Sequence, residues 1–159
     1  GTVDPGAILW LITHHGFDPK GVADTLEHES GLLALAGTAD MAAVVDACRR
    51  GEPAATRALD VYVHRLRAAI AAMVASLGGL DALVFTGGVG ENAPTVRAAA
   101  AAGLGFLGVA LDARRNDEAI GDAAAPEADV TAAGATVRTL VVAAREDLEI
   151  ARAVRARLR

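Results

Sequence analysis

Three closely spaced glycines, Gly87, Gly88 and Gly90, are the residues of this chain best suited to ligand chemistry. They follow an apolar, partly β-branched run at 82–86, which predicts a buried strand. Glycines at a strand-to-helix turn carry no Cβ, so a flat or charged ligand can lie directly on the backbone. Pro94 predicts a helix at about 95–101, whose first N–H groups and positive dipole end are unpaired. The stretch is therefore a candidate nucleotide site.

The same stretch also fits a dinucleotide-binding fingerprint. Residues 88–93 (GVGENA) match G-x-G-x-x-A after a strand, and Asp112 follows about twenty residues on, where that fold places its ribose-binding acid. Against this, Pro94 disfavours the α conformation at Ala93, so we expect an irregular turn through Ala93 that is longer than the fingerprint allows. An NAD-binding, Rossmann-type oxidoreductase domain stays open as an alternative.

Composition restricts the classes of protein that this chain can belong to. Its 159 residues are 53% hydrophobic, which argues against disorder. With 15 basic and 20 acidic residues the net charge is −5, so neither nucleic acid nor an anionic membrane is expected as a partner. Cys48 is the single cysteine and cannot form an internal disulfide, which favours a cytoplasmic location. We expect no signal peptide and no membrane span, and since Gly1 replaces an initiator methionine we expect part of a longer protein.

The first half of the chain predicts helices. Capping aspartates precede prolines at Asp4-Pro5 and Asp18-Pro19, and Asp40 caps a third segment, which predicts helices at about 5–14, 19–28 and 41–50. A longer helix is expected at 53–77. One side of it carries an apolar stripe, Leu59, Val63, Leu66, Ile70, Met73 and Leu77, and the other carries Val61, Ala68, Ala72 and Ala75. A helix that is apolar on two sides is packed on two sides, here against the sheet and against another helix, a missing domain or a partner subunit.

The second half alternates strands and helices. Strands are predicted at 82–86, 106–111 and 137–142, with a weaker one at 128–131, and helices at 95–101 and 146–158. Residues 121–127 are expected to form an exposed loop. The order of elements indicates an α/β fold with a helical lead-in. We expect one domain over 1–159, with a helical part at about 4–77 and an α/β part at about 80–158.

Several segments resemble, in order, the motifs of the acetate kinases, which belong to the acetate and sugar kinase/Hsp70/actin superfamily. Residues 85–92 (FTGGVGEN) resemble the family segment F-T-G-G-[IV]-G-E-N. Further resemblances are 3–5 (VDP) to G-x-[ILV]-D-P, 29–33 (ESGLL) to [KE]-S-G-L-L, 60–66 (DVYVHRL) to D-V-Y-x-H-R-L, Leu111-Asp112 with Asn116 to [VL]-D-x-x-x-N, and 145–151 (REDLEIA) to N-E-E-L-x-I-A. Together they span residues 1 to about 155.

The resemblance implies the C-terminal half of an actin-like ATPase-type (ribonuclease H-like) duplicated fold, with the active site between two halves. It implies transfer of the terminal phosphoryl group of ATP to acetate, giving acetyl phosphate and ADP, with Mg²⁺. By the same resemblance Gly88, Val89, Gly90, Glu91 and Asn92 line an adenosine pocket, Asp40 contacts the nucleotide, and Glu146 helps to hold Mg²⁺. A propionate kinase of the same family stays open, because the acyl pocket lies in the other half.

This chain also departs from the family pattern. Ala42 replaces the arginine of a D-x-R segment that contacts the nucleotide, and Arg145 replaces the asparagine before Glu146. The family's transition-state arginine is expected just upstream of Gly1, so no catalytic residue is assigned within the chain. Phosphoryl transfer depends on positioning and on cations around the transferring group, and half a cleft cannot supply them. We expect this chain alone to be inactive, with its own N-terminal domain and a second copy, in a homodimer, as partners; a non-catalytic domain that acts only by association stays open.

Overall fold

The structure, a computed structural model, describes residues 3–120 and 127–158. The chain divides into two compact units, Gly1–Ala58 and Leu59–Arg159, and the boundary falls inside the long helix α5 (Pro53–Leu77). The sequence predicted one domain with its helical part ending near residue 77. Each unit is described by itself.

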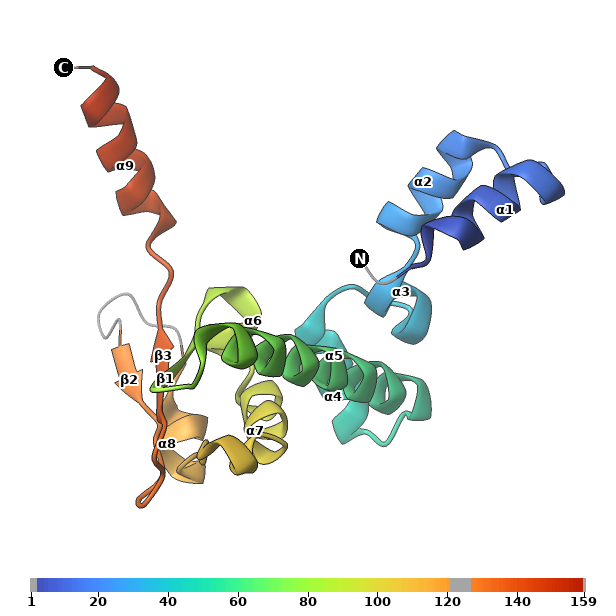
Figure 1. The fold of residues 1–159 in the computed structure, drawn as a ribbon. Helices are drawn as coiled ribbons and strands as arrows, with labels where there is room; N and C mark the ends of the chain where they lie inside the picture. Colours follow the sequence, from blue (N-terminus) through green and yellow to red (C-terminus); the bar gives the residue numbers. More distant parts are fainter. Residues whose placement is uncertain (1–2, 121–126, 159) are drawn as a thin grey trace. The chain divides into compact units, whose positions relative to one another are not determined.

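The first unit is helical, as the sequence predicted (Figure 1). It contains α1 (Pro5–His15), α2 (Pro19–His28), α3 (Gly31–Ala36) and α4 (Met41–Arg49) before α5 begins. The carboxylates of Asp4, Asp18 and Asp40 each accept a hydrogen bond from a backbone N–H of the helix that follows. The predicted helices at 5–14, 19–28 and 41–50 are confirmed to within a residue.

Helix α3 was not predicted, because Ser30-Gly31 was interpreted only as the end of α2. Ser30 has an extended backbone and Gly31 has φ +64°, so the chain turns at these two residues and enters a new helix. Gly37, with φ +74°, ends α3 after six residues. The two glycines adopt left-handed conformations that residues with side chains disfavour. The residues that end α2 are therefore followed at once by α3, a separate helix bounded by Gly31 and Gly37.

One stretch of the first unit, Gly31–Arg49, is long and apolar enough by length and composition to cross a membrane. The core helix of a soluble protein passes the same test, so the feature is weak evidence. Secondary structure divides the stretch into α3 and α4, with Gly37 in a left-handed conformation between them. Part of α4 is also buried, at Met41, Val44, Val45 and Ala47. The stretch therefore carries no argument for a membrane.

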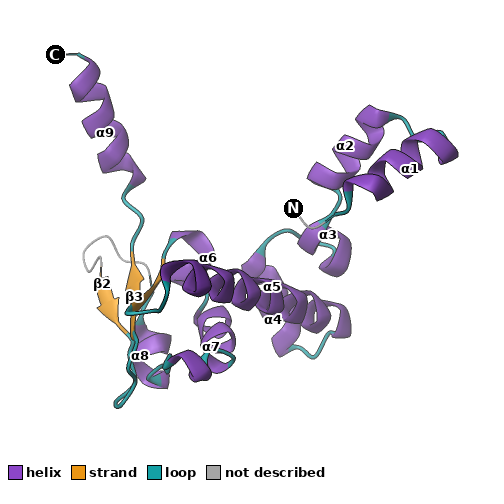
Figure 2. Ribbon diagram, in the orientation of Figure 1, coloured by secondary structure: helices purple, strands orange, loops and turns teal. Residues whose placement is uncertain are grey.

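The second unit holds a small mixed sheet, whose strands are orange in Figure 2. The strand order is β1-β3-β2. Strand β1 (Ala82–Phe85) pairs in parallel with β3 (Arg138–Val142), with Phe85 opposite Val141. Strand β2 (Glu127–Asp129) pairs with β3 in the antiparallel direction. The predicted strands at 82–86 and 137–142 are confirmed, and the weaker one at 128–131 is shifted to Glu127–Asp129. The predicted loop at 121–127 lies outside the described residues, apart from Glu127, which opens β2.

The predicted strand at 106–111 is wrong. Residues Gly105–Leu107 form the 3-10 helix η1, and Gly108 follows with φ +89°. The Gly108 carbonyl accepts hydrogen bonds from the N–H groups of Thr136 and Val137, and Leu111 forms an isolated bridge with Thr131. The left-handed conformation of Gly108 turns the chain sharply. Leu111, the last residue of the predicted strand, forms only the isolated bridge with Thr131, so the apolar run 106–111 does not extend the sheet.

Helices complete the second unit: α6 (Gly87–Asn92), α7 (Pro94–Ala102), α8 (Ala113–Glu118) and α9 (Glu146–Arg157). The predictions at 95–101 and 146–158 are confirmed, whereas α6 and α8 were not predicted. Buried residues from β1, β3 and α7 share one hydrophobic core with Leu104, Val109, Ala119, Val130 and Val137. Leu66 and Ile70, from the predicted stripe of α5, pack against this core.

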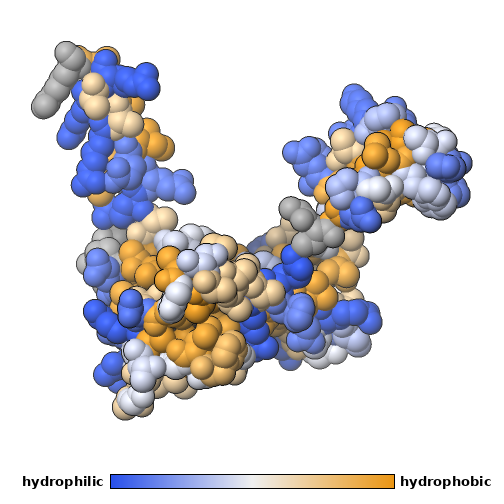
Figure 3. Space-filling view, viewed as in Figure 1, coloured by the Kyte–Doolittle hydropathy of each residue, from blue (hydrophilic) through white to orange (hydrophobic). Residues whose placement is uncertain are grey.

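Strands β1 and β3 each bury only one face, and no residue of β2 is buried. In β1, Leu83 and Phe85 are buried while Ala82 and Val84 are exposed, so the prediction of a wholly buried strand is wrong. On α5, Met73 and Leu77 are exposed, as are Val61, Ala68, Ala72 and Ala75 on the second predicted side. Figure 3 shows apolar surface over the C-terminal half of α5, where a hollow of about 260 Å³ is lined by apolar side chains from Ala69 to Leu83. The second apolar side of α5 and the C-terminal end of its first stripe are thus uncovered in the part of the chain that the structure describes.

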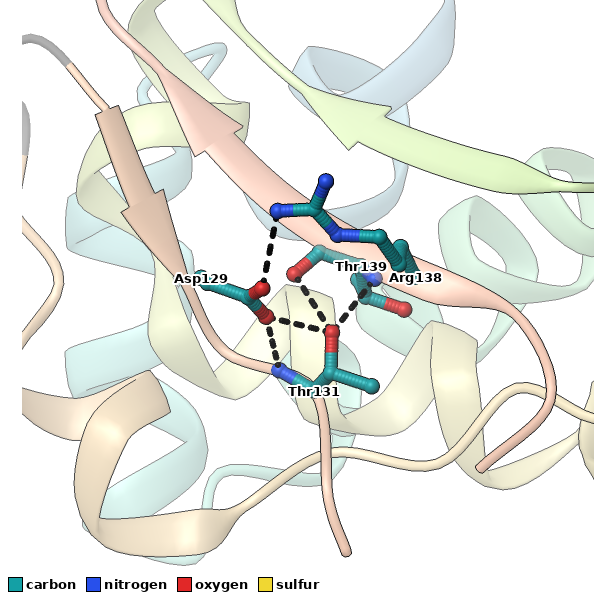
Figure 4. A network of polar contacts seen from close by, with 4 residues as sticks. All are labelled: Asp129, Thr131, Arg138 and Thr139. Carbon is teal, nitrogen blue, oxygen red and sulfur yellow. Dashed lines mark hydrogen bonds and ion pairs between the residues drawn. The ribbon is translucent and has the colours of Figure 1, made fainter. Parts of the chain in front are cut away.

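A polar network joins β2 to β3 (Figure 4). Asp129 accepts hydrogen bonds from the backbone N–H and the hydroxyl of Thr131, and from Arg138 at 3.0 Å. The N–H of Thr139 in turn donates to the Thr131 hydroxyl at 2.8 Å. The Thr131 hydroxyl first, and then the Thr131 N–H and Arg138, lower the pKa of Asp129 to about 2. The network fixes the edge of the sheet where β2 ends.

Candidate functional site

The candidate site lies at one edge of the sheet, because two parallel strands end there. Phe85 closes β1 and Val142 closes β3, and in parallel neighbours the carboxyl ends meet at the same edge. Helix α6 begins directly after β1, and Ala143–Arg145 lead from β3 into α9. Ligands of open α/β sheets bind outside the carboxyl ends of strands, so this edge is where chemistry is expected.

The glycine segment is a helix, where the sequence predicted an irregular turn. Thr86 is extended and Gly87, with φ +72°, lets the chain pass from β1 straight into α6. The helix ends at Ala93, with φ −118° and ψ 77°, and Pro94 opens α7 without a side-chain cap. Pro94 does exclude Ala93 from the α conformation, but the break is confined to that residue. The predicted long irregular turn is therefore wrong, and turn length does not exclude a dinucleotide fingerprint.

The structure gives a different role to each of the three glycines in this segment. Gly87 needs its positive φ for the turn. A Cβ on Gly90 would lie 3.2 Å from the carbonyl carbon of Phe85, so this glycine lets α6 approach the end of β1. A Cβ on Gly88 would meet nothing within 4 Å, and the residue is exposed. Gly88 is therefore the glycine whose backbone is open to a ligand.

The polar side chains of α6 are bound to backbone groups of this chain. Oε1 of Glu91 accepts hydrogen bonds from the N–H of Gly87 at 2.7 Å and from the N–H of Ala144 at 2.8 Å. Nδ2 of Asn92 donates to the carbonyl of Gly88 at 3.0 Å. The predicted ligand residues thus lie together on one short helix, and two of their side chains shape that helix.

Sequence reasoning missed Arg97, which is fully buried in α7. Its guanidinium donates to the carbonyls of Gly90 and Glu91 at the end of α6, at 2.8 and 2.9 Å. It also donates to the side chain and carbonyl of Asn116 and to the carbonyl of Ala119. Burial lowers the pKa of Arg97, and the charge of Asp117 opposes this shift. A lone charge within the run PTVRAAAAA was the available signal, because an arginine in an apolar helix needs partners.

Asn116, one of the residues of the sequence motif, is the second buried part of this arrangement. Its Oδ1 accepts from Nε of Arg97 at 2.8 Å, and its Nδ2 donates to the carbonyl of Pro94 at 3.0 Å. Asn116 therefore ties α8 to the start of α7, and Arg97 ties α7 to the end of α6. The glycine helix is held from behind by a buried, charged set of hydrogen bonds.

Glu146, the candidate metal ligand, is the first residue of α9 and is exposed. It lines an open hollow of about 560 Å³ with Arg145, Glu149 and Ile150. Within 3–120 and 127–158, His, Cys, Asp and Glu side chains form no group of three that could hold a metal ion. Mg²⁺ commonly takes one or two carboxylates with waters and phosphate oxygens, so a single exposed glutamate fits that ion and not a closed protein cage.

Two aspartates of the sequence analysis are helix caps. Asp40 accepts a hydrogen bond from the N–H of Ala42 at 2.9 Å and belongs to the first unit, whereas the glycine helix belongs to the second. Asp112 accepts from the N–H of Arg115 at 2.9 Å and caps α8. It follows an isolated antiparallel bridge at Leu111 where a strand was predicted, so the strand that would place a ribose-binding acid at Asp112 is absent from the described residues.

Comparison with known proteins agrees with this architecture. The chain matches the model of the Acetokinase family over residues 1–152. The acetate kinase of Gloeobacter violaceus is 46% identical over 153 residues, which are 96% of this chain and 36% of the relative. That of Rippkaea orientalis is 42% identical, with 95% of this chain and 36% of the relative covered. The chain thus spans about a third of the length of the curated relatives it matches.

Solved structures show the same fold. The Porphyromonas gingivalis acetate kinase superposes with a TM-score of 0.87 at 32% identity, covering 100% of this chain and 39% of that protein. A propionate kinase from Francisella tularensis gives 0.84 at 30% identity, covering 95% and 37%. The α/β fold predicted as part of an actin-like duplicated fold is confirmed by these neighbours. The family match and the capping role of Asp112 overturn the Rossmann-type alternative.

Proposed function

We propose a function from one premise: this chain belongs to the acetokinase family. The proposed activity is the reversible, ATP-dependent phosphorylation of acetate to acetyl phosphate, to which this chain contributes the ATP- and ADP-binding half. One observation carries the proposal. The FTGGVGEN segment runs from the end of β1 into the short helix α6, at the carboxyl edge of two parallel strands, and the backbone of Gly88 within that helix is open.

The residues of this edge take separate parts in the proposed site. Gly88 and Val89 offer backbone and an apolar side chain to the adenosine, and Gly90, Glu91 and Asn92 complete that wall of the pocket. Glu146 supplies a hard oxygen to Mg²⁺, directly or through water. Mg²⁺ neutralises negative charge on the transferring phosphoryl group. Asp40 contacts the nucleotide in addition to capping α4, and Ala42 and Arg145 modify contacts made by an arginine and an asparagine elsewhere in the family.

The rest of the proposed active site lies outside this chain. Its relatives are about three times as long, since the chain covers 36% of them. The acyl pocket, the phosphate-binding loops and the transition-state arginine belong to the remaining length. Without them nothing positions the acceptor or stabilises the transferring phosphoryl group, so we expect this chain alone to give no turnover.

The test compares this chain with the full-length protein that contains it. Each is incubated with MgATP and acetate, and acyl phosphate is trapped with hydroxylamine. Product from the full-length protein and none from the chain is expected. Product from the chain alone would contradict the division of the active site, and no product from either would contradict the kinase function.

Propionate is the second candidate acceptor, because one structural neighbour is a propionate kinase. The same assay with propionate ranks the two acids by kcat/KM, and a higher value for propionate would reassign the substrate. Cytoplasmic location, association with the N-terminal domain and homodimer formation complete the proposal. They are supported by the single cysteine and by the uncovered apolar side of α5.

A further inference from the structure

Glu91 makes a contact that its place in the glycine motif does not explain. A single oxygen, Oε1, accepts hydrogen bonds from two backbone N–H groups that lie far apart in the sequence, those of Gly87 and Ala144. The first bond closes a loop within α6, where Glu91 lies four residues after Gly87. The second spans 53 residues and reaches the segment that follows β3.

The two bonded segments are the two that the proposed function assigns to ligands. Gly87 is the first residue of α6, which carries Gly88. Ala144 lies two residues before Glu146, the proposed Mg²⁺ ligand. Because β1 and β3 are parallel neighbours, their ends bring these segments close enough for one carboxylate to reach both.

The Ala144 N–H has an exposed environment, whereas Glu91 is half-buried. A bond at the surface is weak as a source of stability, because water competes for the same N–H. Its effect is geometric: the carboxylate fixes how the approach to α9 is placed against the glycine helix. Arg97 holds the other end of α6 through hydrogen bonds to the carbonyls of Gly90 and Glu91. Because that end is held in place, a displacement at the start of α6 is passed to the segment bonded to Glu91.

We propose that Glu91 is a positioning residue that couples the nucleotide segment to the metal segment, so that a nucleotide bound at Gly88 also orders residues 143–146. The proposal rests on the proposed function. It assigns the Glu91 carboxylate to backbone N–H groups of the protein, so that Glu91 supports the wall of the adenosine pocket that Gly88, Val89, Gly90 and Asn92 form with it. It also predicts that nucleotide and metal bind with positive coupling, since each orders a segment that the same oxygen holds.

The experiment is hydrogen–deuterium exchange on the full-length protein with ADP and EDTA, so that no metal links the two segments. In the wild type, ADP is expected to slow exchange in peptides covering 87–93 and 143–147. Glu91→Ala removes the acceptor, so exchange at Ala144 rises about tenfold and ADP protects only the first peptide. Glu91→Gln keeps an oxygen with two acceptor positions and is expected to retain protection of both.

Two further variants separate coupling from general stability. Glu118→Ala removes an exposed ion pair with Arg114 on α8 and should leave both protections as in the wild type. Glu91→Asp keeps the charge on a shorter side chain and should lose the Ala144 protection even if Glu91→Ala folds poorly. A Mg²⁺ titration of the kinase then gives a second readout. Its half-saturating concentration should rise several-fold in Glu91→Ala and stay near wild type in Glu91→Gln and Glu118→Ala.

The outcomes distinguish the two proposals. If ADP protects 87–93 but the Ala144 peptide behaves alike in the wild type, Glu91→Ala and Glu91→Asp, the coupling is overturned and the nucleotide site stands. If ADP protects neither peptide in the wild type, the proposed function is contradicted, and the coupling falls with it.

Discussion

At the scale of single residues, Gly88 and Gly90 lie on the same helix, but only Gly90 has a neighbour that leaves no room for a side chain. Gly90 faces the end of β1, where a Cβ would lie 3.2 Å from the Phe85 carbonyl carbon and 3.5 Å from its Cα. Gly88 faces open space. A glycine within a helix lowers stability relative to alanine, and among the described residues no neighbour requires a glycine at position 88. We propose that the bound nucleotide, and not the fold, requires a residue without a side chain at Gly88.

Gly88→Ala and Gly90→Ala should therefore separate binding from folding. Gly88→Ala is expected to raise the free energy of unfolding by about 0.5–1 kcal/mol and to weaken ADP binding about tenfold or more. Gly90→Ala is expected to lower the free energy of unfolding by about 1–2 kcal/mol, because the Phe85 backbone cannot move aside. Urea unfolding and ADP titration measure both. Unchanged ADP affinity in Gly88→Ala would remove Gly88 from the nucleotide site.

Arg97 is the residue on which the back of the site depends most. Arg97→Met should lower the free energy of unfolding by about 3–5 kcal/mol, since several buried oxygens lose their donor. Arg97→Lys should not restore it, because an ammonium cannot reproduce the guanidinium fork. Arg114→Met, which breaks an exposed ion pair with Glu118, is the matched control and should cost about 0.5 kcal/mol or less. Equal losses from Arg97→Met and Arg114→Met in urea unfolding would contradict the assignment.

At the scale of elements, Asp112 caps α8, although its place in the sequence also suggested a ribose-binding acid. Asp112→Ala should lower the free energy of unfolding by about 1 kcal/mol through loss of the cap, and Asp112→Ser should recover most of it. Nucleotide affinity should stay unchanged in both variants. A loss of nucleotide binding in Asp112→Ala, measured by titration with ADP and with NAD, would return Asp112 to the site.

The network at the end of β2 has a pH dependence of definite sign. The ordinary pKa of Asp129 is 3.8 and the folded value is about 2, lowered first by the Thr131 hydroxyl and then by the Thr131 N–H and Arg138. A lowered pKa means that the ionised form stabilises the folded state above about pH 4 and that this contribution is lost as the pH falls through about 2. Unfolding of Asp129→Asn and wild type should therefore differ more at about pH 6 than at about pH 2. A difference that grows on acidification would refute the network.

At the scale of the whole molecule, the chain leaves apolar surface uncovered. Val84 on the outer face of β1 is 48% exposed, and Met73 and Leu77 on α5 are 59% and 75% exposed. Parallel sheets are normally covered on both faces, and large apolar side chains gathered in one place indicate an interface. The covers predicted from the sequence for this helix are another helix, a missing domain or a partner subunit.

We expect the full-length protein to be a dimer and the paired change Met73→Gln with Leu77→Gln to weaken it. Sedimentation of both proteins across a hundredfold concentration range, about 0.5–50 µM, measures the shift from dimer to monomer. The matched control is Arg114→Gln, at an exposed position of α8. A paired variant that remains as dimeric as the wild type would place this part of α5 outside the subunit interface.

The sequence by itself determined the elements whose signals are local. Aspartate caps with prolines set the starts of α1 and α2, the apolar stripe set α5, and apolar runs set β1 and β3. It also determined the family, because motifs in fixed order identify relatives without any knowledge of contacts. Local signals succeed here because capping, helix periodicity and β-branching act within a few residues.

Only the tertiary structure decided which of these residues make contacts that the fold requires and which leave their backbone open. Three glycines that look alike in sequence separate into a turn, a close contact and an open backbone, because Phe85 lies behind one of them. Arg97, Asn116 and the second bond of Glu91 depend on partners 6 to 53 residues away. The strand predicted at 106–111 failed for the same reason, since Gly108 pairs with the turn before β3. Which atoms meet across such separations is set by packing, and no local pattern encodes it.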